Sequence, residues 1–369
     1  MVSDTDVFIA GAGPAGLAAA ISAAAAGFSV NVADALRPPI NKACGEGLMP
    51  DSIAVLSRLG VTLADSESYC FRGIRFVGEK HSADAFFPAG PGRGVRRTRL
   101  SELMVARAAA LGVRFHWQTT VRGLVENEVV LSNGRIRARW IIGADGHHST
   151  VRQLANLDAR NVRSQRIGLR QHFRIAPWSE MVEVYWGTHS QAYVTPVAKD
   201  EVCVAIISRR RPGPYARELL EFPQLAERLQ SAPESDSVIG SATLDTKVAT
   251  VARGKVALIG DASGGVDALT GEGLALAFRQ AEALTKSMRE DDLTSYSRAH
   301  AVICRLPHFM STSMLLLDRN KVLRERTLRA FARRPELFNS MLRIHIGEVM
   351  PPLWGREGIL SLGARVLLA

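Results

Sequence analysis

Three glycines near the N-terminus have the spacing that a dinucleotide-binding turn requires. Gly11, Gly13 and Gly16 form a GxGxxG pattern between an apolar run, DVFIA, and an Ala-rich segment. In such a turn the first glycine permits the tight bend, the second admits a pyrophosphate, and the third lets helix and strand pack closely. Asp34 ends a second apolar run, where an acid would accept hydrogen bonds from a ribose. The pattern therefore predicts a dinucleotide site.

The segments around this turn have the pattern of a β-α-β unit. DVFIA is predicted to be a buried strand, the Ala-rich run over 17–26 a helix that Gly27 ends, and FSVNVAD a second strand. The amino end of the helix would offer free N–H groups and a partial positive charge to phosphates. The neighbouring residues that we expect to line the same site are Pro14, Ala15 and Ala35.

The composition is that of a globular protein. Hydrophobic residues make up 47% and charged residues 22% of the 369 residues. The longest apolar stretch, over 7–32, is broken by glycines and follows two acids, which fits neither a signal peptide nor a membrane-spanning helix. We therefore expect a cytoplasmic protein. Basic residues exceed acidic ones by 10, which suits an anionic cofactor or a membrane surface, and no nucleic-acid motif accompanies them.

The cysteines do not indicate a metal site or a disulfide framework. Cys44, Cys70, Cys203 and Cys304 are far apart and form no CxxC pair. We expect no metal ion.

Two further motifs distinguish FAD from NAD as the dinucleotide. WIIGADGHHSTVR over 140–152 and GKVALIGDASGGVDALTGEGLALA over 254–277 follow the GxGxxG turn in order. The chain from residue 7 to about 285 resembles the para-hydroxybenzoate hydroxylase class (group A flavoprotein monooxygenases), and the loop KACGEGLMP over 42–50 resembles the geranylgeranyl reductase branch of the same superfamily. The resemblance implies non-covalently bound FAD.

The resemblance also implies roles for individual residues. Asp261, after Gly260, would hydrogen-bond the ribityl chain. The helix start at Gly271, Glu272 and Gly273 would turn backbone N–H groups toward the flavin, where negative charge develops on reduction. The remaining residues that the resemblance places at FAD are Asp145, Gly146 and Arg99.

The loop over 42–50 is expected to decide the chemistry. The resemblance places Cys44 and Gly45 against the flavin, with Cys44 as a tentative catalytic residue, and Lys42 and Glu46 as candidates for the substrate pocket. The alternative is a buried cysteine beside a glycine-rich turn, which is common in proteins.

A later segment, QAYVTPVAKDEVCVAI over 191–206, resembles the floor of the active site in this superfamily. Tyr193 and Pro196 lie in it, and we expect both in the substrate pocket. His172 lies on an alternating strand and is a further candidate, whereas His147 and His148 are expected at the surface. The WxWxIP motif and catalytic lysine of flavin-dependent halogenases are missing, so halogenation is disfavoured.

The whole pattern predicts an α/β fold. A Rossmann-like FAD-binding domain would comprise residues 1–70, 96–160 and 245–295, and a mainly β substrate domain residues 71–95 and 161–244. A helical region would follow over 296–369. Within it, RNKVLRERTLRAFARR over 319–334 interleaves apolar and basic residues. This segment either packs on its own domain or contacts a membrane or an acidic carrier.

The function favoured by these features is an FAD-dependent monooxygenase that uses O2 to hydroxylate or epoxidise a hydrophobic, aromatic or polyketide-like secondary metabolite. The alternative is a reductase of a prenyl or polyene C=C bond, favoured by the Cys44 loop. A weaker alternative is a non-catalytic flavin-binding subunit. Because no second GxGxxG follows a strand, NAD(P)H would bind only transiently, or a separate reductase would supply reduced flavin.

Overall fold

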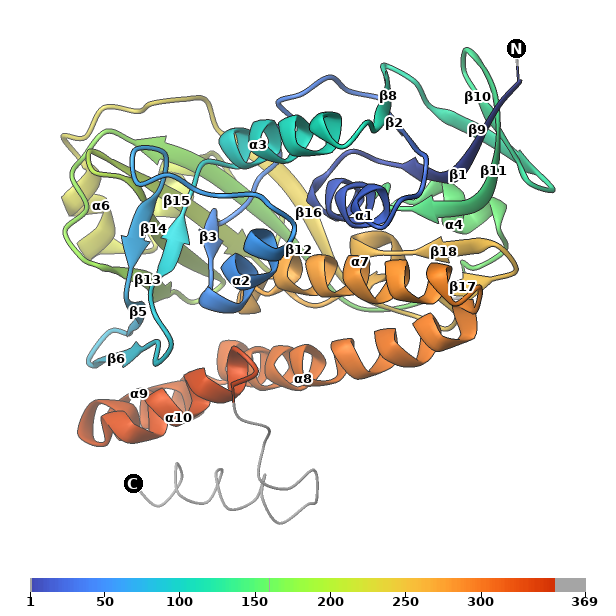
Figure 1. Ribbon diagram of the computed structural model, residues 1–369. Coiled ribbons are helices and arrows are strands. Elements are labelled where there is room, and N and C mark those ends of the chain that lie inside the picture. Colours follow the sequence, from blue (N-terminus) through green and yellow to red (C-terminus); the bar gives the residue numbers. More distant parts are fainter. Residues whose placement is uncertain (1, 159, 349–369) are drawn as a thin grey trace.

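The structure is a computed structural model that describes residues 2–158 and 160–348. Two eight-stranded sheets form its centre, and helices cover them on the outside (Figure 1). This confirms the predicted α/β class with a helical C-terminal region, although residues 349–369 of that region lie outside the described residues.

The first sheet holds the predicted β-α-β unit. Its strand β1 lies between β11 and β2 and runs parallel to both, so that Ala10 is level with Gly143 on one side and Ala33 on the other. The carboxyl ends of three strands therefore meet at one edge, where ligands of such sheets bind. In sheet order the strands are β17 (Ala252–Arg253), β18 (Val256–Leu258), β11 (Gly134–Gly143), β1 (Val2–Ala10), β2 (Val30–Asp34) and β8 (Arg114–Trp117), with β10 (Glu128–Leu131) on β11 and β9 (Val121–Val125) on β10.

Three helices pack on the first sheet. The helix α1 (Pro14–Ala25) begins with proline, whose fixed φ suits the first helical position, and it packs against α3 (Arg97–Ala110) and α7 (Gly273–Arg289). Alanines on α1 allow close approach to the sheet, and the shared core includes Ile9, Leu17 and Phe278. The short helix α4 (Thr150–Leu154) follows β11, and α2 (Pro50–Arg58) packs on α7.

The second sheet provides the floor of the predicted substrate domain. Its strands, in order, are β19 (Gly264–Gly265), β16 (Ile239–Val248), β12 (Arg160–Phe173), β15 (Glu201–Ser208), β14 (Ser190–Ala198), β13 (Met181–Trp186), β5 (Gly73–Val77) and β6 (Ser82–Phe86). The smaller elements nearby are β3 (Gly47–Leu48), β7 (Gly92–Gly94), β4 (Tyr69–Phe71), α5 (Tyr215–Leu219), α6 (Pro223–Leu229), η1 (Gly260–Ser263) and η2 (Ala268–Thr270).

Three C-terminal helices form an outer layer along one side of the molecule (Figure 1). They are α8 (Leu293–Arg319), α9 (Lys321–Arg333) and α10 (Pro335–His345). Both α9 and α10 pack against β6, and the stacked rings of Phe331 and Phe338, 4.8 Å apart, join α9 to α10. No helix in the described ranges is long and apolar enough to cross a bilayer.

Candidate active site

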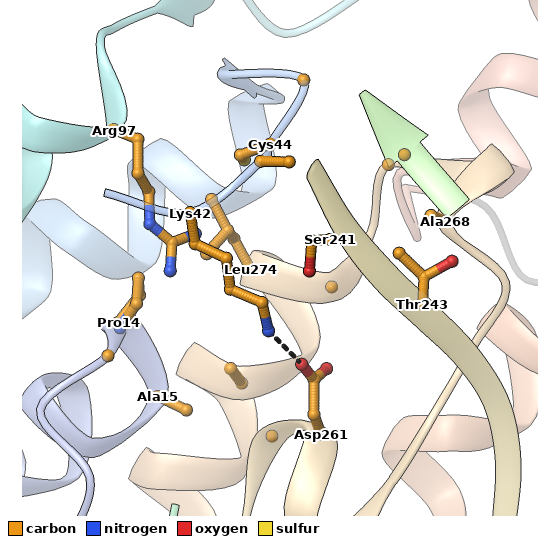
Figure 2. A pocket seen from close by; sticks show the side chains of 18 of the residues that line it. Pro14, Ala15, Lys42, Cys44, Arg97, Ser241, Thr243, Asp261, Ala268 and Leu274 are labelled. Carbon is orange, nitrogen blue, oxygen red and sulfur yellow. Dashed lines mark ion pairs between the residues drawn. The ribbon is translucent and has the colours of Figure 1, made fainter. Parts of the chain in front are cut away.

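A cavity of about 600 Å³ runs from the glycine turn of the first sheet to the second sheet and the C-terminal helices. Most of the predicted site residues lie on its wall, and Figure 2 shows several of them around one space. The predicted residues that line it are Gly11, Gly13, Pro14, Ala15, Asp34, Ala35, Lys42, Cys44, Gly45, Glu46, Asp145, Gly146, Tyr193, Gly260, Asp261, Gly271 and Gly273.

The three glycines of the turn have three different surroundings. Gly11 has a φ of +103°, which strongly favours glycine, and a Cβ there would lie 2.4 Å from the Ala144 carbonyl oxygen. A Cβ on Gly16 would lie 1.8 Å from the Gly11 carbonyl oxygen, so this glycine serves close packing. A Cβ on Gly13 would meet no protein atom within 4 Å and would instead project into the space that a pyrophosphate needs.

Two carboxylates shape the wall at the strand ends. Asp34 accepts hydrogen bonds from the backbone N–H groups of Ala12 (2.7 Å) and Leu36 (2.8 Å), which fixes the turn. Asp145 Oδ2 caps α4 by accepting from Thr150 and Val151, while its buried Oδ1 has no hydrogen-bond partner among the described residues. This unsatisfied oxygen beside the open space at Gly13 fits a bound dinucleotide.

The arginine at the cavity is Arg97, and the prediction of Arg99 is wrong. Arg99 forms ion pairs with Glu67 (2.5 Å) and Glu102 (2.8 Å) and does not line the cavity. Arg97 lines it, and its buried Nε has no partner within the described part of the chain. Figure 2 shows its guanidinium pointing toward the space beside Pro14, as expected for a side chain that holds an anionic cofactor.

A small charged cluster lies at Asp261. Lys42 Nζ is 3.7 Å from Asp261 Oδ2 (Figure 2), and His147 Nε2 is 3.3 Å from the same oxygen. His147 was expected at the surface, but its side chain is largely buried in the cavity wall, whereas His148 is exposed. Burial lowers the pKa of His147 and the Asp261 carboxylate opposes this shift, so a neutral imidazole is favoured at neutral pH.

The start of α7 turns its backbone to the cavity and its acidic side chain away. Gly271 and Gly273 line the cavity, whereas Glu272 is buried behind it, 3.7 Å from Nδ1 of His345 on α10. Burial, with Asp51 nearby, raises the pKa of Glu272 to about 8, and burial lowers the pKa of His345 to about 4. The expected cofactor contact is therefore through backbone N–H groups and not through this carboxyl group.

The Cys44 loop is held from behind by a buried polar network. Glu46 accepts from the Arg97 N–H (2.9 Å) with one oxygen and lies 2.6 Å from His172 Nε2 with the other. His172 Nδ1 is 2.8 Å from Asp236, which also pairs with Arg170. His172 is thus part of the network and does not line the cavity, contrary to its prediction as a pocket residue.

Glu46, His172 and Cys203 lie close enough together to hold a metal ion, with one ligand atom from each within 4.8 Å of the others. However, Arg170 Nη1 is only 2.7 Å from His172 Nδ1, and a guanidinium beside the site disfavours a second cation. Burial also raises the pKa of the Cys203 thiol well above its ordinary value, which favours the neutral form. We therefore interpret the group as a hydrogen-bonded ion-pair network.

The far end of the cavity is an apolar chamber, which we define by Phe71, Phe76, Met314, Phe338 and Met341. These side chains come from β4, β5, α8 and α10, and all pack in one hydrophobic cluster. The Cys44 loop adjoins the chamber, because a Cβ on its last glycine would lie 3.7 Å from the ring of Phe71.

The two residues predicted on β14 have different positions. Tyr193 lines the cavity and donates to the carbonyl oxygen of Leu269 at 2.9 Å, and burial raises its pKa well above the ordinary value. Pro196 lies instead in a separate small cavity beside Trp178, so its prediction as a pocket residue is wrong. Successive positions of a strand face opposite sides, and the three-residue offset between them accounts for the difference.

Sequence comparison identifies the family. The family model described as an FAD binding domain matches residues 4–290, so the chain belongs to this family of FAD-binding flavoproteins. This agrees with the glycine turn, the unsatisfied Asp145 oxygen and the unpaired Arg97 nitrogen on the cavity wall.

Three curated proteins are similar to this chain in sequence. A menaquinone reductase of Mycolicibacterium smegmatis is 29% identical over 331 residues, covering 81% of this chain and 80% of its own. Digeranylgeranylglycerophospholipid reductase 1 of Methanothermobacter thermautotrophicus is 26% identical, covering 74% of each. A flavin-dependent monooxygenase of Mycobacteroides abscessus is 27% identical over 172 residues, which cover 40% of this chain and 36% of that protein.

Among solved structures, a flavoprotein/dehydrogenase from Cytophaga hutchinsonii has the same fold. It superimposes with a TM-score of 0.82 over 99% of this chain and 98% of its own, at 18% identity. The protein is thus an FAD-dependent oxidoreductase by family.

Proposed function

We propose that this protein is an FAD-dependent reductase that saturates a carbon–carbon double bond in an isoprenoid chain. The observation that carries the proposal is the apolar chamber at the far end of the dinucleotide cavity. Its wall of aromatic, methionine and aliphatic side chains suits a flexible hydrocarbon chain, because methionine adapts its shape to irregular ligands.

The relatives that match along most of this chain include proteins named as reductases and one named as a putative monooxygenase. The menaquinone reductase covers 81% of this chain and the digeranylgeranyl lipid reductase 74%, and both names describe isoprenoid compounds. A putative FAD-dependent monooxygenase of Bacillus subtilis is 25% identical and covers 77% of this chain, so the choice of reduction rests on the apolar chamber and on the menaquinone reductase, which covers more of this chain than the other two.

Saturation of a double bond needs a hydride at one carbon and a proton at the other. Bound FAD, once reduced, would supply the hydride. Cys44 lies on the cavity wall between the cofactor end and the chamber, and its backbone carbonyl is held at 3.7 Å by the Cys203 thiol. We assign Cys44 as the proton donor, with Glu46 and His172 as positioning residues that hold its loop in place.

The source of electrons remains an expectation from the sequence. NAD(P)H would enter the cavity transiently, or a separate reductase would reduce the flavin, because the sequence contains only one GxGxxG turn.

Single-turnover reoxidation tests the proposal. Protein reduced with dithionite is mixed without oxygen with a short-chain menaquinone or a geranylgeranyl lipid, and flavin absorbance and product mass are followed. The proposal predicts reoxidation of the flavin together with a product whose isoprenoid chain has gained two hydrogen atoms. The mass of a menaquinone product is read after air has oxidised its head group back to the quinone, so that quinol formation is not counted.

Cys44→Ala should slow this step by roughly 10²- to 10⁴-fold while FAD stays bound. Cys70→Ala is the matched control, because Cys70 is exposed and outside the cavity lining, and it should leave the rate unchanged. Equal rates for the two variants would contradict the assignment of Cys44.

The second candidate is the monooxygenase that the sequence favours. The relative from Mycobacteroides abscessus supports it. The test is whether the flavin of the reduced protein stays reduced when either isoprenoid is added without oxygen. If it does, and if oxygen is inserted into a ligand once O2 is added, the protein is the monooxygenase and not the reductase.

A further inference from the structure

The outward sides of α8 and α9 carry charge of one sign. Residues 293–334 contain nine basic and two acidic side chains. Of the basic ones only Arg324 is buried, whereas Asp318 is buried and Glu325 half-buried. All eight exposed charged side chains of this segment are therefore basic. We call these outward sides the basic face.

The charges on α9 form a continuous stripe. Positions 322, 326, 329 and 333 fall within about 60° of one another around a helix of 3.6 residues per turn, and all four are exposed. The opposite side, with Thr327 and Phe331, is buried. Arg326, Arg329 and Arg333 make no ion pair within the described part of the chain, so their charge is available to a ligand.

Large apolar side chains lie among these charges. Val302 is 72% exposed, Leu316 56% and Val322 62%. A helix surface that mixes arginines with exposed aliphatic side chains suits the boundary between lipid headgroups and acyl chains, where arginines bind phosphates and aliphatic groups enter the apolar layer.

The basic face is also connected to the cavity. α8 contributes Met310 and Met314 to the cavity wall, and α9 packs on α10, which contributes Met341. The helix α8 has 27 residues and is about 40 Å long, so the face is long enough to rest on a bilayer. A lipid substrate would then enter a cavity whose wall belongs to the docked helices.

We propose that the basic face docks this protein on an anionic lipid bilayer, without insertion of a spanning helix. Only the connection to a lipid substrate rests on the proposed function. The docking itself rests on the charge and the exposed apolar side chains.

Vesicle sedimentation of the full-length FAD-bound protein tests this inference. The probes are vesicles of phosphatidylcholine alone and vesicles in which about a third of the lipid is phosphatidylglycerol. We expect binding to the anionic vesicles that weakens as salt rises, and little binding to the neutral ones. R326Q/R329Q/R333Q should lower the partition coefficient on the order of 100-fold, at roughly five-fold for each arginine.

The matched control is R135Q/R137Q/R139Q, three exposed arginines on β11 of the first sheet, which should bind vesicles as the unaltered protein does. Equal loss in both triple variants would overturn the assignment to the basic face. Absence of binding to anionic vesicles at low salt, or binding of an acidic polypeptide in its place, would overturn the inference. Vesicle binding and the single-turnover reaction are measured separately, so failure of one leaves the other interpretable.

Discussion

The cofactor end of the cavity and the Cys44 loop beside it are held in place by different parts of the chain. The cofactor end consists of backbone: the turn at Gly11 and Gly13, the strand ends, and the amino end of α7. The Cys44 loop is instead held by charged side chains from distant segments, with His172 between Glu46 and Asp236. A backbone site is sensitive to any added Cβ, whereas a side-chain network is sensitive to loss of one partner. A substitution in the glycine turn should therefore act through the atoms that it adds, whereas a substitution in the network should act through the partner that it removes.

The largest effect is expected in the network. Glu46→Ala would leave Nε2 of His172 and the backbone N–H of Arg97 without their hydrogen-bond partner. Each unsatisfied buried group costs about 1–3 kcal/mol in the free energy of unfolding, so the two together should cost about 2–6 kcal/mol. Urea denaturation measures this change. Glu102→Ala is the control, because Glu102 pairs with Arg99 at the surface, and it should cost less than about 1 kcal/mol. Similar costs for both variants would show that the network does not hold the loop.

The glycine turn should separate folding from cofactor binding. Gly16→Val would clash with the Gly11 carbonyl and destabilise the fold by about 3 kcal/mol. Gly13→Val meets no protein atom, so it should leave thermal stability of the FAD-free protein unchanged and abolish FAD retention. FAD content and melting temperature measure the two effects. A Gly13→Val protein that purifies with full FAD would contradict the position assigned to the pyrophosphate.

The arginine assignment gives an intermediate effect. Arg97→Gln should weaken FAD binding roughly 10- to 100-fold, because a hydrogen bond to a charged group contributes about 1.5–3 kcal/mol. Arg99→Gln should leave the dissociation constant unchanged, since its guanidinium is engaged by two surface acids. Fluorescence titration of the FAD-free protein with FAD measures the dissociation constant of each variant. A larger increase for Arg99→Gln than for Arg97→Gln would favour Arg99, as the sequence predicted.

Asp261→Ala is expected to have the smallest effect on FAD. Its side chain is 42% exposed, so solvent screens its interactions, and the dissociation constant should rise only about 10-fold. The same titration measures it. A loss as complete as that of Gly13→Val would mean that this carboxylate, and not the backbone turn, dominates binding.

The cofactor end could be predicted from the sequence because its residues follow strands whose parallel ends must meet. Asp34 was predicted from the strand that it ends, and Asp145 and Asp261 from the family resemblance, and all three line the cavity. The arginine was missed because residues two apart on a helix point about 200° away from each other, and nothing in the sequence fixes where α3 begins. The buried position of His147 was missed for a similar reason, because the side chains of adjacent residues in a turn, here His147 and His148, point in different directions.

The apolar chamber and the network behind the Cys44 loop could not be predicted, because their contacts join segments far apart in the chain. Glu46 and His172 are separated by 126 positions, and no local pattern pairs them. The contribution of α10 to the cavity depends on how the C-terminal layer packs, which tertiary contacts decide. Glu46 and His172 were each predicted as substrate-pocket residues, but nothing in the sequence indicated that the two contact each other.

The central claim is that the cavity delivers a hydride from the cofactor and a proton from the protein to one isoprenoid double bond. The most direct measurement is mass spectrometry of a short-chain menaquinone after anaerobic turnover in D2O with reduced flavoprotein. Because the N–H groups of reduced flavin exchange with solvent, the account predicts a product whose chain has gained two deuterium atoms, one delivered from the flavin and one from the solvent-exchanged protein donor. A chain that remains unsaturated, or a product that carries added oxygen only when air is admitted, would contradict it.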